Sequence, residues 1–237
     1  LMLYFLCFRS PELGLRHRRE KLFFTGDCLR RAFRIGLPMG CERIIMCGAQ
    51  IMSTVIVAPL GIYAIAANAF AITAESLCYM PGYGIADAAT TLVGQSLGAK
   101  RHDLARSFAR ITVVMGMAVM TVMGAIMYLA APLMIGVMTP VPEVVSLGVS
   151  ILRIEAFAEP MFAAAIVAYG VFIGAGDTLV PATMNFVSIW AVRLTLAALL
   201  APSMGLHGVW IAMCIELCFR GMIFLARMKW GRWIKRL

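Results

Sequence analysis

The sequence predicts an all-α, polytopic membrane protein with six transmembrane helices. Of its 237 residues, 62% are apolar and only 14% are charged, and the mean hydropathy is +0.88. Soluble domains contain about half apolar and a quarter charged residues, so this chain has too few polar side chains to cover a water-facing surface. Because a helix needs roughly 20 apolar residues to cross the hydrocarbon layer, the chain has room for about six crossings.

Uncharged stretches bounded by proline and glycine place the helices. Ile44–Ala74 contains no charged side chain but is divided by Pro59-Leu60-Gly61, and Ile111–Pro142 is also uncharged. Proline and glycine commonly mark the ends of helical segments. The expected spans are Phe33–Pro59, Ala64–Val93, Ala105–Ala131, Val145–Gly174, Leu179–Ala201 and Gly208–Met228.

The basic residues predict the topology. Seventeen of the 21 lysines and arginines lie in segments 9–34, 100–110 and 227–236, where they flank apolar blocks. Positive charge collects on the cytoplasmic side of membrane proteins, which places both ends of the chain in the cytoplasm of a cell-membrane protein. Clusters of this kind are typical of topogenic charge, so we expect no nucleic-acid partner.

Three segments follow from this map. Leu1–Phe8 is apolar but too short to span, and residue 1 is not methionine, so we expect the chain to be a fragment. Residues 1–32 are expected to be the end of a preceding helix and a basic cytoplasmic linker. The six-helix lobe occupies 33–229, and 230–237 form a basic cytoplasmic tail.

Once the basic clusters at the span ends are set aside, ten charged residues remain inside the predicted spans. Each costs roughly 2.5–3.5 kcal/mol at a helix centre, so ten of them cannot face lipid. We therefore expect them to face the protein interior, to pair, or to line a wet cavity. They are Glu42, Arg43, Glu75, Asp87, Arg153, Glu155, Glu159, Arg193, Glu216 and Arg220.

Glu159 is the strongest candidate for binding a proton or cation. It lies midway along its span and is followed by Pro160, which cannot donate to the carbonyl of Ala156. The helix is therefore expected to bend at this point. A carboxylate beside a freed carbonyl at membrane depth suits a cation or proton. The alternative is that Glu159 is a buried partner of Arg193, which lies midway along the next helix.

Glu42, Glu75 and Asp87 are further candidates for which functional and structural roles both stay open. Glu42 follows Pro38 by four residues and lies about 12 Å along the helix from Arg34. Glu75 precedes Pro81-Gly82-Tyr83-Gly84, a segment that allows its helix to bend. Asp87 lies nearer the cytoplasmic end and suits a solvated mouth of the cavity.

Arg193 is kept with Asp87 as a secondary site candidate, and the charges below have structural explanations. Glu216 and Arg220 are four residues apart with the acid first, which predicts an ion pair within one helix. Arg153 lies near a span end and can extend toward water, and Glu155 is expected to balance it.

No metal site or catalytic cluster is expected. The seven cysteines form no Cys-x-x-Cys pair, and the three histidines have no zinc spacing. A membrane-embedded enzyme needs a nucleophile with a base, or a metal cluster. The sequence contains neither His-x-x-x-His nor Glu-x-x-His, so we predict that the protein is not an enzyme.

Four segments, taken in order, resemble the MATE family of multidrug exporters. Gly36-Leu37-Pro38 with Glu42 resembles the start of the family's helix seven, and Gly82–Arg101 the end of helix eight with its basic loop. The remaining two are Gly174–Thr178 with Pro181, similar to the turn after helix ten, and Gly205–Trp210 with Glu216, Arg220 and Lys229-Trp230, similar to helix twelve.

The resemblance implies two six-helix lobes around a central cavity that opens alternately to each side, with only the C-terminal lobe present here. It implies antiport of organic, often cationic compounds against H⁺ or Na⁺, with no cofactor besides the coupling ion. The implied partners are the missing N-terminal lobe, small drug-like substrates and the bilayer. The family's acids in helices seven, eight and ten correspond, by helix, to Glu42, Glu75 and Glu159.

Two other functions are compatible with this architecture. An exporter of lipid-linked oligosaccharides is expected to have a more basic cavity, whereas the charges inside these spans are six acids and four arginines. A non-transporting membrane assembly subunit is the other alternative for a single lobe.

Overall fold

The computed structural model describes residues 26–230 and Trp233, and it divides the chain into two compact units. Residues 26–36, the start of helix α2, are the described part of the first unit. The second unit begins at Leu37 and contains the remainder. Of the segment 1–32, expected to be a helix end and a basic linker, residues 1–25 lie outside the described residues, and residues 26–32 belong to α2 (Gly26–Val57) instead. Most of the tail expected at 230–237 also lies outside the described residues.

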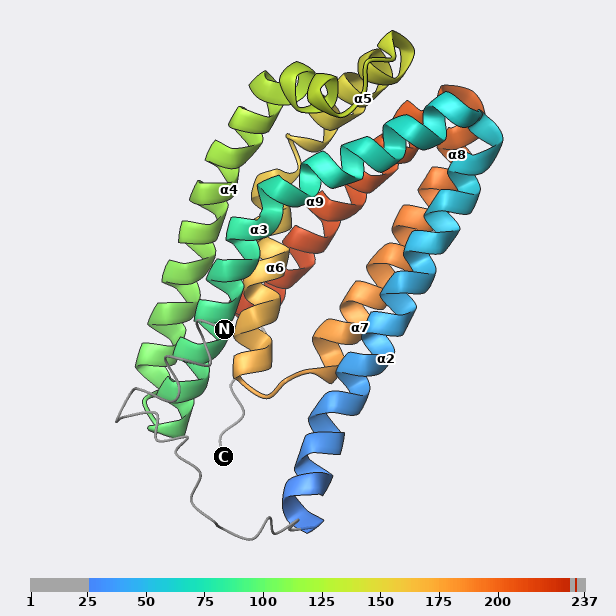
Figure 1. Ribbon diagram of the computed structural model, residues 1–237. Helices are drawn as coiled ribbons and strands as arrows, with labels where there is room; N and C mark the ends of the chain where they lie inside the picture. Colours follow the sequence, from blue (N-terminus) through green and yellow to red (C-terminus); the bar gives the residue numbers. More distant parts are fainter. Residues whose placement is uncertain (1–25, 231–232, 234–237) are drawn as a thin grey trace, which may run out of the picture. The chain divides into compact units, whose positions relative to one another are not determined.

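The described residues are helical apart from short connections and contain no strand (Figure 1). Five helices are long and apolar enough to cross a membrane, and α5 with α6 forms a sixth span if the bent pair counts as one. The six-helix expectation is thereby confirmed. The elements are α2 (Gly26–Val57), η1 (Ala58–Leu60), α3 (Ile62–Gly98), α4 (His102–Met138), α5 (Pro142–Glu155), α6 (Glu159–Gly174), α7 (Leu179–Val187), η2 (Ser188–Arg193), α8 (Leu194–Met204) and α9 (Leu206–Trp230).

Helix α6 is the centre of the second unit, because it packs against α3, α4 and α9. All its residues from Phe162 to Ala168 are buried. Small side chains allow close approach between membrane helices. A Cβ at Gly170 would lie 2.5 Å from the Ala86 carbonyl oxygen, and one at Gly174 would lie 2.5 Å from that of Thr90. The Thr90 hydroxyl also donates to the Gly170 carbonyl at 2.8 Å.

The span expected over residues 145–174 is broken in the middle. Helix α5 ends at Glu155, α6 begins at Glu159, and the two axes differ in direction by 60°. Pro160 lies in the first turn of α6, where its missing N–H and fixed φ suit a helix start. The bend predicted at this proline is confirmed, and it separates the span into two helices.

The other two prolines proposed to bend helices differ from Pro160. Helix α3 continues through Pro81 without interruption. Pro38 lies within α2, but its side chain is outside the described set. Bending at these two positions therefore stays a prediction.

The span expected over residues 179–201 contains a π-helical turn that the sequence did not indicate. Residues Ser188–Arg193 form this turn between α7 and α8. A π turn inserts an extra residue into the helical ladder and is frequently found at functional sites. Arg193 is its last residue, so the turn sets the direction of that side chain.

The connection between α6 and α7 is tied to α9 by an ion pair. Arg227, near the end of α9, pairs with the buried carboxylate of Asp177. Its guanidinium also lies 5.4 Å from the centre of the Phe172 ring. This contact fixes the turn Gly174–Thr178, which the sequence analysis had singled out.

Candidate functional site

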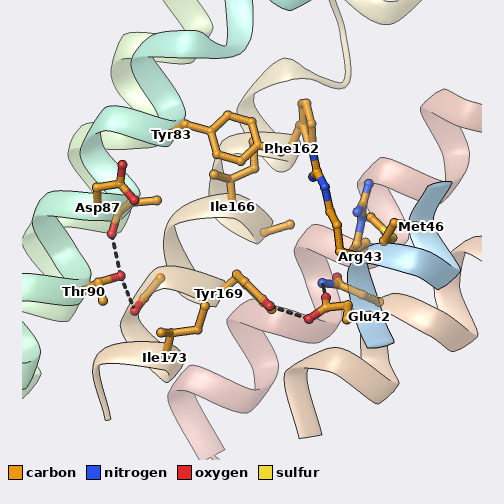
Figure 2. Close-up of a pocket in the computed structure, with 15 residues that line it drawn as sticks. Glu42, Arg43, Met46, Tyr83, Asp87, Thr90, Phe162, Ile166, Tyr169 and Ile173 are labelled. Carbon is orange, nitrogen blue, oxygen red and sulfur yellow. Dashed lines mark hydrogen bonds between the residues drawn. The ribbon is translucent and has the colours of Figure 1, made fainter. Parts of the chain in front are cut away.

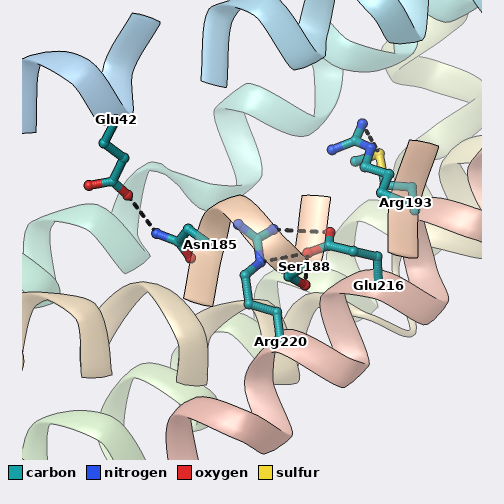
Figure 3. Close-up of polar contacts among 7 residues, drawn as sticks. Glu42, Asn185, Ser188, Arg193, Glu216 and Arg220 are labelled. Carbon is teal, nitrogen blue, oxygen red and sulfur yellow. Dashed lines mark hydrogen bonds and ion pairs between the residues drawn. The ribbon is translucent and has the colours of Figure 1, made fainter. Parts of the chain in front are cut away.

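Glu42 is held by side chains from two other helices. Tyr169 of α6 donates its hydroxyl to Glu42 Oε2, and Asn185 of α7 donates from Nδ2 to Oε1 at 2.8 Å. Figure 2 shows the Tyr169 contact, and Figure 3 shows the Asn185 contact. Both carboxylate oxygens therefore have a donor. Neither Tyr169 nor Asn185 was predicted, because nothing in their own sequence neighbourhood marks them as partners of a residue more than 120 positions away.

A cavity of about 340 Å³ lies beside this carboxylate, between α2, α3, α6, α7 and α9 (Figure 2). Its charged lining residues are two acids, Glu42 and Asp87, and two arginines, Arg43 and Arg220. A cavity with a mainly apolar wall and a few convergent polar groups is the usual form of a small-molecule site. The aromatic lining residues are Tyr83, Phe162 and Tyr169.

Asp87 and Glu42 therefore line one cavity, from α3 and α2. Asp87 is exposed on α3, and its place at a solvated opening stays a prediction. Glu42 also lines a smaller, more apolar cavity of about 260 Å³ between α2 and α7. Its lining includes Met46 and Phe186.

Glu75 and Glu159 lie elsewhere, in the interior of the helix bundle. The exposed fraction is 4% for Glu75 and 1% for Glu159. Neither lines the cavity beside Glu42. The three acids that the family resemblance grouped together thus occupy two places: Glu42 at the cavity wall, and Glu75 with Glu159 in the core.

Both carboxyl oxygens of Glu159 are buried without a hydrogen-bond partner among the described residues. Its Cβ and Cγ lie against Gly124 of α4, where an added Cβ would be 3.1 and 3.3 Å away. The Ala156 carbonyl oxygen is closer still, at 2.8 Å from that added Cβ. Gly124 therefore makes room for both the bend and the acid.

Glu155 does not balance Arg153, contrary to the expectation from their spacing. Glu155 is 1% exposed and faces the core, whereas Arg153 is exposed and its guanidinium lies 5.2 Å from the centre of the Tyr128 ring. Residues two positions apart on an α-helix, such as Arg153 and Glu155, are rotated by about 200° about the helix axis, so their side chains point to opposite faces. Glu155 therefore joins Glu75 and Glu159 as a third interior acid.

The predicted pair of Glu216 and Arg220 is present on α9 (Figure 3). Arg220 Nε lies 3.1 Å from Glu216 Oε1, and Nη2 donates to Oε2 at 3.3 Å. Ser188, in the π turn, also donates to Glu216 Oε1 at 2.6 Å. Arg220 lines the cavity as well, with its guanidinium 5.6 Å from the centre of the Phe162 ring.

Arg193 is not paired with Glu159, the alternative considered for that acid. Its Nη2 donates instead to the sulfur of Met213 at 2.8 Å (Figure 3). A thioether is a weak acceptor that carries no charge. Arg193 takes part in none of the ion pairs formed by the described residues.

Within the described ranges, no group of three or more acidic, histidine or cysteine side chains converges closely enough to hold a metal ion. The arrangement is thus a cavity with a fixed carboxylate at its wall, backed by unpaired acids in the core. These features define a polytopic helical lobe with a cavity of small-molecule size between its helices.

Residues 38–199 match the family model MatE, which places this chain in the MatE family. It is 29% identical to the probable multidrug resistance protein NorM of Thermotoga maritima, over 99% of this chain and 51% of that protein. It is 30% identical to the protein of the same name from Brucella suis, over 98% of this chain and 50% of that protein.

Solved structures show the same fold. The Vibrio cholerae MATE transporter VcmN in its bent form matches with a TM-score of 0.84 at 17% identity, over 98% of this chain and 52% of that one. A MATE protein in the straight conformation gives a TM-score of 0.83 at 18% identity. The chain thus spans about half the length of its curated relatives, which is consistent with one lobe of a two-lobe transporter.

Proposed function

We propose that this chain supplies the C-terminal lobe of a secondary multidrug exporter that exchanges organic, often cationic compounds for H⁺ or Na⁺. The observation that carries the proposal is the cavity beside Glu42. There a carboxylate with a fixed position stands near the aromatic rings of Tyr83, Phe162 and Tyr169. Aromatic faces and a carboxylate together attract amphipathic cations.

Coupling to an ion gradient is assigned to Glu42, Glu75 and Glu159. An ion shifts a conformational equilibrium only if it binds one state better than the other. Glu159 suits this role because it is the first residue of α6, at the 60° bend. Binding of a proton or cation neutralises Glu159 and so lowers the cost of burying this side chain at the bend. The arrangement of α5 and α6 that buries it is then favoured.

The proposed partners are an N-terminal six-helix lobe, drug-like substrates and the bilayer of the cell membrane, with both chain ends in the cytoplasm. Export of lipid-linked oligosaccharides is less favoured, because the cavity has two acids beside its two arginines. A diphosphate headgroup needs a net positive site. A non-transporting assembly subunit has no need of such a cavity.

Dye efflux from cells tests the proposal. The full-length protein containing this chain is expressed in an efflux-deficient bacterial host that is loaded with a fluorescent cationic dye. We expect efflux to depend on one of two ion gradients, that of protons or that of sodium. The gradient whose dissipation stops efflux identifies the coupling ion. The chain expressed alone is the control, and we expect it to insert without exporting dye.

Two results would overturn the proposal. One is dye retention equal to that of cells without the protein, at verified membrane insertion. The other is efflux that persists when both gradients are removed, since an antiporter has no other energy source.

A further inference from the structure

A second groove, of about 310 Å³, lies between α4, α5 and α9. Helix α4 contributes Tyr128, α5 contributes Arg153, and α9 contributes Ile211 and Ile215. Phe157, in the three-residue connection between α5 and α6, completes the wall. The groove shares no lining residue with the cavity beside Glu42, so it is a separate feature of the lobe.

The walls of this groove are apolar and open to the outside of the helix bundle. The exposed fraction is 73% for Phe157 and 46% for Ile215, and Tyr128 is exposed as well. Beside the groove, α4 exposes Ile126 and Leu129. Exposed apolar side chains on a membrane-spanning helix face acyl chains. A hydrocarbon chain is therefore the neighbour that this surface suits.

Arg153 is the one charged residue among the described residues that line the groove, and Tyr128 holds it in place. Its Nε donates to the Tyr128 carbonyl oxygen at 3.4 Å, and its guanidinium lies 5.2 Å from the centre of the Tyr128 ring. The Phe157 ring packs edge-on against the same tyrosine, with 5.8 Å between the ring centres. This arrangement leaves both terminal nitrogens of Arg153, Nη1 and Nη2, for a ligand.

The charge of Arg153 has no acidic partner within the described ranges, because none of the ion pairs found there includes it. A guanidinium in an apolar, membrane-facing surface is costly without a counter-charge. Its planar fork matches two oxygens of a phosphate group. Since the described lining contains no carboxylate that could receive an ammonium group, a headgroup of net negative charge fits better than a zwitterionic one.

The bend between α5 and α6 brings Arg153 toward the membrane surface. Arg153 lies near the end of α5, which begins at Pro142, so it is about 16 Å along that helix at 1.5 Å per residue. Because α5 differs in direction from α6 by 60°, only about half of this length, roughly 8 Å, runs along the α6 axis. An arginine side chain at that depth reaches the level of the lipid headgroups.

We infer that this groove binds one phospholipid of net negative charge. Its phosphate lies on the guanidinium of Arg153, and one acyl chain lies along Phe157, Ile211 and Ile215. The bound lipid then touches the connection between α5 and α6, since Phe157 belongs to it. This site goes beyond the proposed function and does not depend on it. The topology predicted from the sequence places the lipid in the outer leaflet.

Fluorescence quenching by brominated lipids tests the site. The full-length protein with Phe157→Trp is placed in vesicles of equal amounts of phosphatidylglycerol and phosphatidylcholine, and only one of the two lipids carries bromine in its acyl chains. Bromine quenches tryptophan only at short range, and the protein with Phe157 gives the background from its other tryptophans. We expect occupancy of the groove by phosphatidylglycerol to exceed that by phosphatidylcholine about fivefold.

Arg153→Gln, made in the protein with Phe157→Trp, is expected to abolish this preference. Arg110→Gln is the matched control, because Arg110 is also exposed on α4 and its loss changes the net charge equally. It lies about 27 Å along the helix from Tyr128. We expect the preference to remain about fivefold in this control.

Four results would overturn the inference. They are equal quenching by the two lipids in the protein with Arg153, no quenching by either lipid, a preference that persists in Arg153→Gln, and an equal loss of preference in Arg110→Gln. The measurement uses neither dye nor ion gradient. A protein that prefers phosphatidylglycerol at this groove but exports no dye therefore contradicts the proposed function and leaves the lipid site in place.

Discussion

Asn185 on α7 donates a hydrogen bond to Glu42 on α2, with 2.8 Å between Nδ2 and Oε1. With the contact from Tyr169, this is one of the two hydrogen bonds between side chains that join α2 to other helices in the described part of the chain. The cavity wall and the attachment of α2 to α6 and α7 thus depend on the same carboxylate. A ligand that competes for Glu42 competes with that attachment.

Glu42→Gln is expected to weaken the binding of a cationic dye to the full-length protein about tenfold, which corresponds to about 1.4 kcal/mol. The amide keeps the shape but loses the negative charge. The binding of a neutral analogue of similar size is expected to stay within twofold. Equilibrium dialysis or fluorescence titration of the purified protein measures both, and Glu143→Gln is the matched exposed control. Equal losses for the charged and the neutral compound would contradict a role for the charge.

Glu159→Gln is expected to abolish gradient-driven efflux while membrane insertion stays normal. The glutamine has nearly the same volume, so packing against Gly124 is retained, but it cannot exchange a proton. Efflux assays, with the amount of protein in the membrane fraction measured in parallel, check this prediction. Wild-type drug resistance in cells with this variant would refute the assignment of Glu159.

Arg220→Gln is expected to lower the free energy of unfolding by about 3–5 kcal/mol, because it leaves the Glu216 carboxylate buried without its partner. The double variant Glu216→Leu with Arg220→Met is expected to recover most of that loss, since it removes both charges. Unfolding in detergent, followed by circular dichroism, compares the two. If the double variant were no more stable than the single one, the loss would come from the hydrogen bonds and packing of these two side chains and not from an unpaired charge.

Pro160→Ala is expected to reduce the angle between α5 and α6, because alanine restores an N–H donor for the Ala156 carbonyl. Spin labels at Ser146, which is exposed, and at Ala175, which is half-buried, are expected to move farther apart as the two helices straighten. Pro132→Ala is the matched control, since Pro132 lies inside α4 without interrupting it. An unchanged distance in Pro160→Ala would mean that packing at Gly124, and not the proline, sets the bend.

The sequence was sufficient for the helices and the turns between them. Uncharged length, proline and glycine are local signals, and they placed all six spans and the bend at Pro160. The i, i+4 spacing also predicted the pair of Glu216 and Arg220 on one helix.

The sequence was not sufficient for contacts between helices. Tyr169 and Asn185 reach Glu42 only because α6, α7 and α2 meet, and no local pattern encodes that meeting. The assignment of Glu155 to Arg153 was wrong because proximity along the chain was given more weight than the helical angle between them. The π turn at Ser188–Arg193 also has no composition signal, since its residues are ordinary for a helix.

The glycine contacts between α3 and α6 have a mechanical consequence. The backbones of α3 and α6 lie in close contact at Gly170 and Gly174, and the Thr90 hydroxyl adds a hydrogen bond across that contact, so we expect the two helices to move together. In a conformational change of this lobe, α3 and α6 are therefore expected to move as one rigid unit. We expect bending within this lobe at the three residues between α5 and α6. We expect α2 to move when Glu42 loses its hydrogen bonds to Tyr169 and Asn185.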